Sequence, residues 1–496
     1  MRLTVLLLVW VVACQNEPEK VAASAAVSRS ALDCGVAIVG GGAAGLHTAY
    51  RLAADYGSRV CLFEKESYLG GRIHDLSRNE GGPYIGTGAR RIMEGQSVVF
   101  ALADELGITY ESVPWQDDLI NARGFAAYNS DDLNAQAYPL VDNATGESAL
   151  YDQLRHGPER AHADAYPDFR AYARAVIGAQ AYQFLRDVSR FRADFEYPLD
   201  ARGYLDYLDE EWDVCCTPSY PIGGMSEFIR RMEAASLAHG VQIFKSEPAL
   251  QINRGSGGYV ITTPSYTASA AQLVLAVDAN NLKHIQGDVI SGITAQPEFA
   301  QLIGVKVATI TQWWPSRWWE GLNGKQTHRA WTTESCINHI EIPVDAYGIA
   351  QNVTRSVYDD DLNCVMFWEE AQKQGEAHVN AEIKRGLQQL FPGATIPDAL
   401  KTHVQIWPAA WYWLRAGSPY TNADIAQWAI EPLTGESVSL VGESYNPQRS
   451  GWSDAAYKSS IATLDAKFGF HLSGAANAHA LMRARPQRAG LAQAGH

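Results

Sequence analysis

A glycine-rich turn that joins two short apolar runs constrains the fold of this chain most strongly. Val36-Ala37-Ile38-Val39 predicts a buried parallel strand, and Gly40-Gly41-Gly42-Ala43-Ala44-Gly45 follows it without a break. A helix is then expected from Ala43 to about Asp55, and Val60-Cys61-Leu62-Phe63 predicts a second strand. This order of elements indicates an α/β fold that opens with a strand–helix–strand unit.

The three glycines of the turn have different physical roles in a nucleotide site. Gly40 allows the tight turn, Gly42 lets the backbone approach a pyrophosphate, and Gly45 lets helix and strand pack closely. The pyrophosphate would rest on the helix N-terminus, where N–H groups and the helix dipole favour an anion. Glu64, at the end of the second strand, can accept hydrogen bonds from ribose hydroxyls. The pattern therefore predicts dinucleotide binding, with a purely structural glycine loop as the alternative.

The N-terminal segment, residues 1–14, predicts export rather than a folded element. Met1-Arg2 precedes an apolar run from Leu3 to Val12, which is too short for a membrane-spanning helix. Val11-Val12-Ala13-Cys14 resembles a bacterial lipobox, in which the cysteine is lipidated and becomes the new N-terminus. An ordinary secretory signal with an incidental cysteine is the alternative. We expect residues 15–32 to form a polar tether and the mature protein to lie in the envelope or outside the cell.

Charge and cysteine content exclude some partners and cofactors. A net charge of −15 argues against nucleic acid, because phosphates require a basic surface. Beyond Cys14 the cysteines form no CxxC pair and the histidines show no metal-binding spacing, so we expect no metal. Some cysteines of an exported protein could form disulfides, with the vicinal Cys215–Cys216 as one candidate, but six cysteines allow fifteen pairings. The six are Cys34, Cys61, Cys215, Cys216, Cys336 and Cys364.

Changes in composition divide the chain into segments. Residues 121–218 are rich in aromatic residues, Ala, Arg and Asp with few β-branched runs, which predicts a helical insertion. Strand-like runs return near Val241–Phe244 and Leu273–Val277, and a strand before residue 443 leads into a helix over residues 453–468. The expected organisation is a nucleotide-binding domain of residues 33–90, 219–290 and 433–472, a mixed α+β substrate domain of residues 91–120 and 291–432, the insertion of residues 121–218, and a disordered tail of residues 473–496.

Several stretches spread along the chain resemble the flavin amine oxidase superfamily. The run from Glu64 to Arg72, which ends in Leu69-Gly70-Gly71-Arg72, resembles the extended FAD fingerprint of that superfamily. Further matches are Tyr220–Met225, Glu247–Ile252, Leu273–Val277, Val441-Gly442-Glu443 and Gly451–Ala456. The resemblance extends from about Asp33 to Phe470 and implies a Rossmann-like FAD-binding domain of the GR2 type, with FAD rather than NAD as the cofactor.

The resemblance also assigns cofactor contacts. Glu443 would bind the ribityl chain, Ala249 would contact the adenine end, and the helix that starts at Ser453 would face the flavin O2. A helix N-terminus suits that position because the reduced flavin carries negative charge there. The expected FAD contacts are Gly40, Gly42, Ala44, Gly45, Glu64, Lys65, Gly71, Arg72, Gly88, Ala89, Arg90, Ala249, Gly442, Glu443, Trp452 and Ser453.

Gly88-Ala89-Arg90 points to one branch of the superfamily. It resembles the Gly-x-Arg of L-amino acid oxidases of the snake-venom and sea-hare defence type, whose arginine holds the substrate carboxylate. A guanidinium suits this task because it is always charged and can donate two parallel hydrogen bonds. We expect Arg90, before Arg91, in this role; a contact with the FAD phosphates or a surface acid is the alternative.

Tryptophans are expected to form the walls of the substrate site. Trp452 would lie against the substrate and the flavin face, and Trp411 with Trp413 would form a second aromatic wall. Core packing is the alternative for Trp411 and Trp413.

A lysine near the flavin N5 is a further feature of many relatives, which carry it about ten residues before an aromatic-Trp pair. Counting back in this way from Trp318-Trp319 leads to Thr309, with Lys306 three residues early. Either a local shift brings Lys306 to the flavin, or this lysine is missing.

The resemblance implies FAD-dependent oxidative deamination of L-amino acids to 2-oxo acids, with release of ammonia and hydrogen peroxide. The expected partners are an amino acid or amine and molecular oxygen, a homodimer is one expected arrangement, and membrane contact is expected only through an N-terminal lipid. The alternatives are an amine or polyamine oxidase, a flavin dehydrogenase with another electron acceptor, a desaturase or porphyrinogen-type oxidase, and a flavoprotein without turnover.

Overall fold

The computed structural model describes residues 28–76, 85–113, 118–138, 146–214, 217–320, 322, 329–342, 352–446 and 451–470. The predicted signal, Cys14, most of the tether, Cys215, Cys216 and the tail of residues 473–496 lie outside these ranges. Within them, none of the helices combines the length and the apolar character needed to cross a bilayer.

The first sheet contains the predicted strand–helix–strand unit. β1 (Ser30–Val39), α1 (Ala43–Tyr56) and β2 (Val60–Phe63) confirm the expected helix and second strand. β1 lies between β2 and β13 (Tyr266–Leu275) and is parallel to both. It begins at Ser30 because residues 30–34 pair with residues 266–270 of β13, so the predicted tether of residues 15–32 is too long at its C-terminal end. The sheet also contains β10 (Gln242–Phe244), β11 (Gln251–Gly255), β12 (Gly258–Thr262) and β19 (Val438–Leu440).

Helices distant in sequence pack together on this sheet. α14 (Ser453–Phe468) has the predicted bounds, and its Ser460 hydroxyl lies 2.9 Å from His47 Nδ1 and 2.7 Å from Thr48 Oγ1 of α1. Apolar side chains of α1, α14, α2 and α8 form one core with β1 and β2. Two of these helices are α2 (Ser97–Glu105) and α8 (Ser226–Ala238). A second core, formed with other side chains of β1 and β2, contains α9 (Ala279–Leu282), α10 (Asp288–Thr294) and α13 (Asn422–Ile430).

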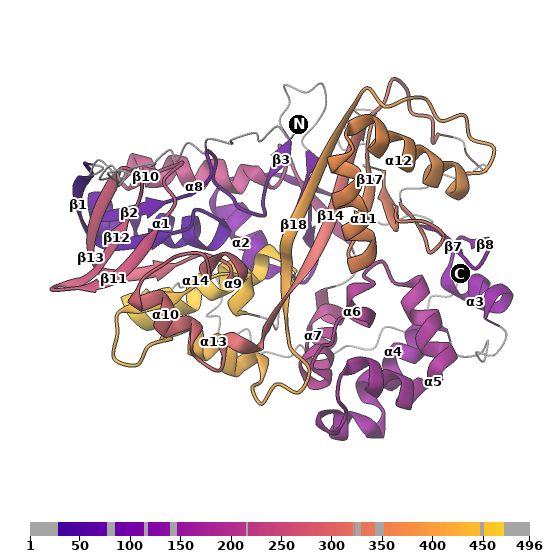
Figure 1. The fold of residues 1–496 in the computed structure, drawn as a ribbon, viewed down its shortest axis with the longest axis horizontal. Helices are drawn as coiled ribbons and strands as arrows, with labels where there is room; N and C mark the ends of the chain where they lie inside the picture. The colour runs from indigo at the N-terminus through magenta and orange to yellow at the C-terminus, as the bar shows by residue number, and fades with distance from the viewer. Residues whose placement is uncertain are drawn as a thin grey trace, which may run out of the picture.

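The second sheet is built on two long antiparallel strands, β14 (Leu302–Trp313) and β18 (Lys401–Leu414). Figure 1 shows them at the centre of the molecule, with the first sheet on one side and α11 (Leu362–Lys373) and α12 (Glu376–Leu390) on the other. The strand order is β18-β14-β17-β16-β15-β7-β8. The further strands are β7 (Asp118–Ala122), β8 (Phe125–Ala127), β15 (Arg329–Thr332), β16 (His339–Glu341) and β17 (Val353–Asp359).

The helical insertion starts later than predicted. β7 and β8 belong to the second sheet, since β7 pairs in parallel with β15, so the helical segment begins at α3 and not at residue 121. The helical segment also ends before the predicted residue 218, because β9 (Pro218–Pro221) pairs with β5 (Ile92–Met93) and β6 (Tyr110–Ser112). The pairing partners that decide both boundaries lie far away in the sequence. The helices of the segment are α3 (Ser130–Ala137), α4 (Glu147–His156), α5 (Phe169–Val188), α6 (Ala193–Glu196) and α7 (Ala201–Val214).

Candidate active site

The glycine turn leaves open space at the start of α1. Gly40 has a φ of +103°, and a Cβ there would lie 2.5 Å from the Ala276 carbonyl oxygen. A Cβ at Gly45 would lie 2.0 Å from the Gly40 carbonyl oxygen. At Gly42, in contrast, an added Cβ would meet no atom of the described chain within 4 Å. This glycine is therefore not required by the protein's own packing, and the space beside it fits a pyrophosphate at the helix N-terminus.

Glu64 is held in place at the end of β2. Its Oε2 accepts from the Gly41 N–H at 2.6 Å, and its Oε1 accepts from the Glu66 N–H at 2.8 Å. The side chain is buried, and this burial raises the pKa of Glu64. The Glu247 N–H donates to the Glu64 carbonyl at 2.8 Å, which brings the segment of Ala249 beside the carboxylate. Lys65 is exposed and lies 3.4 Å from Glu66. Ribose and adenine contacts at Glu64 and Ala249 fit this arrangement.

Two predicted cofactor residues that are 371 positions apart form a partly buried ion pair. Arg72 Nη1 lies 2.6 Å from Glu443 Oε2 and donates to the Ala410 carbonyl at 2.7 Å. Burial opposes the charge of Arg72, but Glu443 and Asp278 outweigh it and raise the pKa of Arg72. Glu443 Oε1 accepts from the Tyr412 and Gly451 N–H groups, each at 3.1 Å. The pair thus ties the Gly-Gly-Arg turn to the C-terminal flavin signature.

α14 begins beside this pair. Trp452 occupies the N-cap position and its side chain makes no capping hydrogen bond, so it does not occupy the N–H groups of the first turn, which begins at Ser453. Gly442 adopts a φ of +144°, and its N–H donates to Ser459 of α14 at 3.0 Å. The helix start is therefore oriented as an anion-stabilising group, as the predicted contact with flavin O2 requires.

Three arginines converge on one buried glutamate at the end of β16. Arg91 Nη1 lies 3.1 Å from Glu341 Oε1, and Arg90 and Arg355 both donate to Glu341 Oε2. The Arg91 guanidinium also lies over the Trp452 ring, 5.8 Å from its centroid. The sequence assigned the carboxylate contact to Arg90 before Arg91, whereas Arg91 is the arginine that the structure places over Trp452. Glu341 and Arg355 were not recognised in the sequence, because each lies in a β-strand without a motif.

Charge in this arginine cluster (Arg90, Arg91, Arg355 and Glu341) is unbalanced. Burial opposes ionisation of Glu341, yet Arg355, Arg90 and Arg91 hold its pKa well below the usual range. Burial lowers the pKa of Arg355 to about 10, and the charges of Arg90 and Arg91 act in the same direction. Asp75 lies near Arg90; burial raises the pKa of Asp75 to about 6, so at neutral pH it still adds negative charge beside the cluster. Among the described residues, three guanidinium groups share Glu341 and Asp75 lies near one of them, so positive charge still exceeds negative charge and the site favours an additional anion.

The tryptophans of β18 have different neighbours. Trp413 packs edge-on against Tyr207 of α7, with ring centroids 4.4 Å apart, and Trp411 packs against Phe191 at 6.2 Å. Both belong to the core between the second sheet and the helical segment. Trp407 is partly buried against the same core, but it also donates from Nε1 to the Thr87 carbonyl at 3.0 Å, and a Cβ on Gly88 would lie 3.4 Å from its ring. Trp407 is therefore the tryptophan of this run that contacts the Gly88 loop.

Thr309 and Lys306 lie in different surroundings on β14. Thr309 is buried and donates from Oγ1 to the Thr87 carbonyl at 2.9 Å, next to Gly88. Lys306 Nζ lies 2.5 Å from Glu369 of α11, and both side chains are partly exposed. A local shift that brings Lys306 to the Gly88 loop is therefore not observed.

Lys306→Met is expected to leave substrate oxidation and flavin reoxidation within about twofold of the unmodified protein. A partly exposed ion pair contributes only about 0–1 kcal/mol to stability. Stopped-flow absorbance of the flavin, mixed first with substrate and then with oxygen, measures both steps. Reoxidation slowed more than about tenfold would instead place Lys306 at the flavin.

Comparisons with known proteins show the family and the fold of this chain. A family model described as flavin containing amine oxidoreductase matches residues 43–459. An L-amino-acid oxidase of Siganus canaliculatus is 42% identical over 73 residues, which are 15% of this chain and only 14% of that protein. Wild-type putrescine oxidase bound to putrescine aligns with 89% of this chain and 100% of its own, at a TM-score of 0.66 and 15% identity. A double mutant of putrescine oxidase aligns with 88% of this chain and 99% of its own, at a TM-score of 0.63 and 15% identity. At this identity the two solved structures show a common fold.

Proposed function

This chain belongs to the family of flavin-containing amine oxidoreductases, and we propose that within it the chain is an FAD-dependent L-amino acid oxidase. FAD, when bound, supplies the acceptor for the electrons of the amine. The residues of the chain supply the selection of the amine, and the proposal therefore depends on the chemistry of the arginine cluster. The short stretch similar to an L-amino-acid oxidase supports the same assignment.

The position of Arg91 over Trp452 is the observation that carries the proposal. Trp452 is the N-cap residue of the helix that would face the flavin, so a carboxylate held by Arg91 would lie close to the reacting carbon. Arg90 and Arg355 share Glu341 with Arg91, which fixes its guanidinium and leaves an excess of positive charge. A substrate carboxylate balances that charge, whereas a diamine such as putrescine adds to it. We place the carboxylate contact at Arg90 and Arg91, with Arg91 first.

A comparison of L-ornithine with putrescine tests the proposal, because the two molecules differ only by the carboxylate. We expect kcat/KM for L-ornithine, and for the better neutral L-amino acids, to exceed that of the matching amine at least about 100-fold. Hydrogen peroxide release and anaerobic bleaching of the flavin are the two measurements. Faster turnover of putrescine would assign the protein to the amine oxidases. Bleaching without peroxide would identify a dehydrogenase, the alternative raised by Thr309.

We also propose that the protein is exported. The disulfides Cys34–Cys61 and Cys336–Cys364 support this proposal, since disulfides persist mainly in oxidising compartments. The mass of the mature N-terminus tests both versions: a diacylglyceryl group on Cys14 identifies a lipoprotein, a cleaved chain without lipid identifies a secreted protein, and an intact Met1 contradicts export.

A further inference from the structure

The two disulfides of the described chain lie in different environments. Cys34 and Cys61 join β1 to β2 in the first sheet, with exposed fractions of only 3% and 0%. Cys336 and Cys364 join the turn between β15 and β16 to the first turn of α11, and both residues are partly exposed. Reagents in solution can therefore approach the second disulfide without unfolding of the protein, whereas the first one is shielded.

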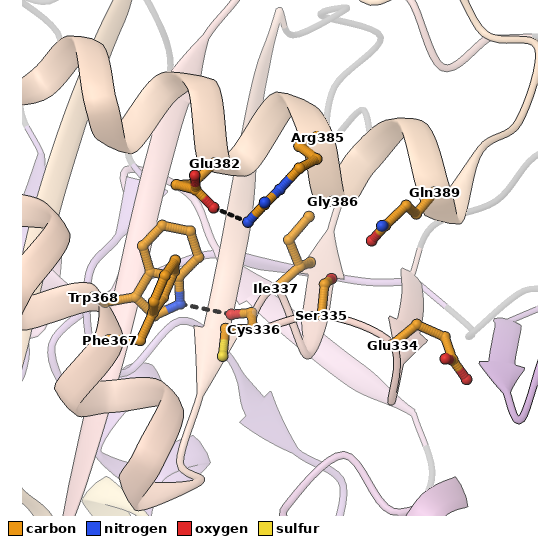
Figure 2. A pocket seen from close by; sticks show the side chains of 10 residues that line it. All are labelled: Glu334, Ser335, Cys336, Ile337, Phe367, Trp368, Glu382, Arg385, Gly386 and Gln389. Carbon is orange, nitrogen blue, oxygen red and sulfur yellow. Dashed lines mark hydrogen bonds and ion pairs between the residues drawn. The ribbon is translucent and has the colours of Figure 1, made fainter.

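A cavity of about 350 Å³ lies beside the accessible disulfide. Its walls are the β15–β16 turn, α11 and α12, and Cys336 is one of the lining residues (Figure 2). The Trp368 indole donates to the Cys336 carbonyl at 2.6 Å, which fixes this turn against α11. Glu382 and Arg385 form an ion pair at the opposite wall. The cavity is large enough for a small thiol next to Cys336.

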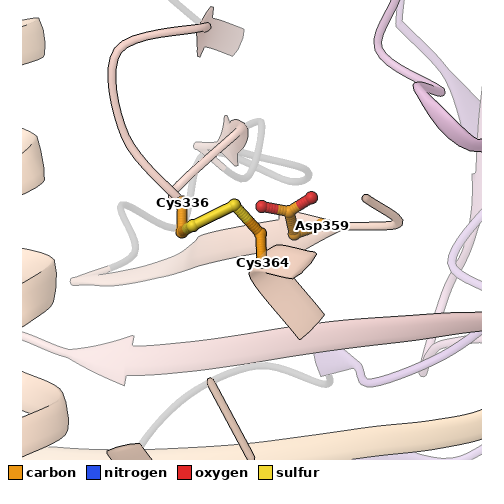
Figure 3. Close-up of side chains that lie close together, drawn as sticks. All are labelled: Cys336, Asp359 and Cys364. Atoms are coloured by element: carbon orange, nitrogen blue, oxygen red, sulfur yellow. A yellow bond between two sulfur atoms is a disulfide. The ribbon is translucent and has the colours of Figure 1, made fainter. Parts of the chain in front are cut away.

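A buried carboxylate lies against the same disulfide. A carboxylate oxygen of Asp359 and the two sulfurs all lie within 4.8 Å of one another (Figure 3). Because the sulfurs are bonded to each other, this group does not offer thiolates to a metal ion. Asp359 Oδ1 accepts from the Asp361 N–H at 3.0 Å, while Oδ2 has no hydrogen-bond partner among the described residues. Burial raises the pKa of Asp359 well above its usual range; Asp360 and Asp361 add to this rise and Arg192 opposes it.

Of the two cysteines, Cys364 is the one at a helix N-terminus, the position that favours a thiolate leaving group. It lies in the first turn of α11, where Asp361 is the N-cap residue and accepts from the Cys364 N–H at 3.3 Å. A thiolate at a helix N-terminus is stabilised by the helix dipole and by the backbone N–H groups. Cys336, in the turn, lines the cavity through which a thiol would enter.

We propose that Cys336–Cys364 is an exchange-active disulfide that low-molecular-weight thiols reduce in the folded protein, with Asp359 as the proton donor. The thiolate of the incoming thiol attacks Cys336 Sγ, the Cys336–Cys364 bond breaks, and its electron pair goes to Cys364 Sγ, which takes the proton of Asp359. A second thiolate then attacks the mixed disulfide on its small-molecule sulfur and releases Cys336, which takes a proton from solvent. In total, two thiols are oxidised to one disulfide, Cys336 and Cys364 become thiols, and Asp359 recovers its proton from solvent.

Glutathione treatment of the folded, FAD-containing protein tests this proposal. Samples are alkylated at intervals, digested and analysed by mass spectrometry, with Cys34–Cys61 as the internal control in the same molecule. We expect Cys336–Cys364 to be reduced at least about tenfold faster than Cys34–Cys61, through a glutathione adduct on Cys336. Equal rates for the two disulfides, or an adduct on Cys364, would overturn the proposal.

Asp359→Asn tests the proton donor separately. The amide keeps the acceptor for the Asp361 N–H but carries no acidic proton. We expect reduction of Cys336–Cys364 at neutral pH to slow about tenfold, while the unfolding temperature and the flavin spectrum stay close to those of the unmodified protein. Reduction at the unmodified rate would remove Asp359 from the mechanism. If the variant does not fold, the comparison of the two disulfides in the unmodified protein still decides whether exchange occurs.

Discussion

Replacing Arg91 with alanine is expected to lower kcat/KM for a good L-amino acid substrate about 100- to 1,000-fold, which corresponds to about 3–4 kcal/mol of transition-state stabilisation. The same substitution is expected to leave kcat/KM for the matching amine within about threefold. The physical reason is that a charge-assisted hydrogen bond between a guanidinium and a carboxylate in a water-poor site is lost only for the substrate that carries the carboxylate. The preference for L-ornithine over putrescine should therefore almost disappear.

Steady-state peroxide release with L-ornithine and putrescine gives both values for each variant. Arg254→Ala is a suitable control, because Arg254 is an exposed arginine of β11, in the first sheet, that pairs with Glu436. This control should behave as the unmodified protein does with both substrates. A uniform loss with both substrates in Arg91→Ala would indicate that Arg91 organises the site or the cofactor and does not select the carboxylate. Arg90→Ala, measured in the same way, shows which of the two arginines makes the contact.

Gly45→Val is expected to prevent accumulation of folded, flavin-containing protein. A Cβ at this position would lie 2.0 Å from the Gly40 carbonyl oxygen and 2.7 Å from the Ala276 Cβ, so the backbone of the glycine turn and Ala276, just after β13, must move. Overpacking of this kind destabilises a core by about 1–3 kcal/mol or more, and here it also displaces the start of α1. Soluble yield, the FAD absorbance ratio and thermal unfolding measure the effect.

Gly42→Ala is the matched control for this prediction. An added Cβ at Gly42 meets no atom of the described chain within 4 Å, so the fold without FAD should unfold at nearly the unmodified temperature. The methyl group would occupy the space expected for the pyrophosphate, and FAD affinity should fall at least about tenfold. If Gly42→Ala binds FAD as tightly as the unmodified protein, the pyrophosphate lies elsewhere. If Gly45→Val folds and binds FAD normally, neither folding nor FAD binding requires the close approach of α1 to Gly40 and Ala276.

The elements that the sequence predicts well are those built from local contacts. The helix predicted to begin at Ala43 and the strand Val60–Phe63 agree with α1 and β2, and α14 has the predicted bounds of residues 453–468. A glycine turn, an apolar run and a helical period each act over a few residues, so neighbours in the chain decide them. The family model and the common fold with putrescine oxidase confirm the fold class and the FAD cofactor that these motifs indicated.

The side chains of β18, which point alternately to opposite faces of the sheet, show what the sequence could not predict about the site. Successive side chains of a strand point to opposite faces, so Trp411 and Trp413 pack towards the helical segment, while Tyr412 hydrogen-bonds Asp278 at 2.6 Å on the other side. A run of aromatic residues predicts a wall but not which of its members contacts the site. Trp407 has that contact because the Gly88 loop lies against its ring.

By itself, the sequence determined the nucleotide-binding unit, the family and the pool of arginines and tryptophans from which the site is built. The tertiary structure alone decided how they combine: Arg72 with Glu443, Cys336 with Cys364, and Arg90 and Arg91 with Glu341, about 250 positions away. Such pairings depend on strand register and on the packing of separate segments, which no local pattern contains. The same packing gathers three guanidinium groups around Glu341, and the resulting excess of positive charge among the described residues gives the site its expected preference for a substrate with a carboxylate.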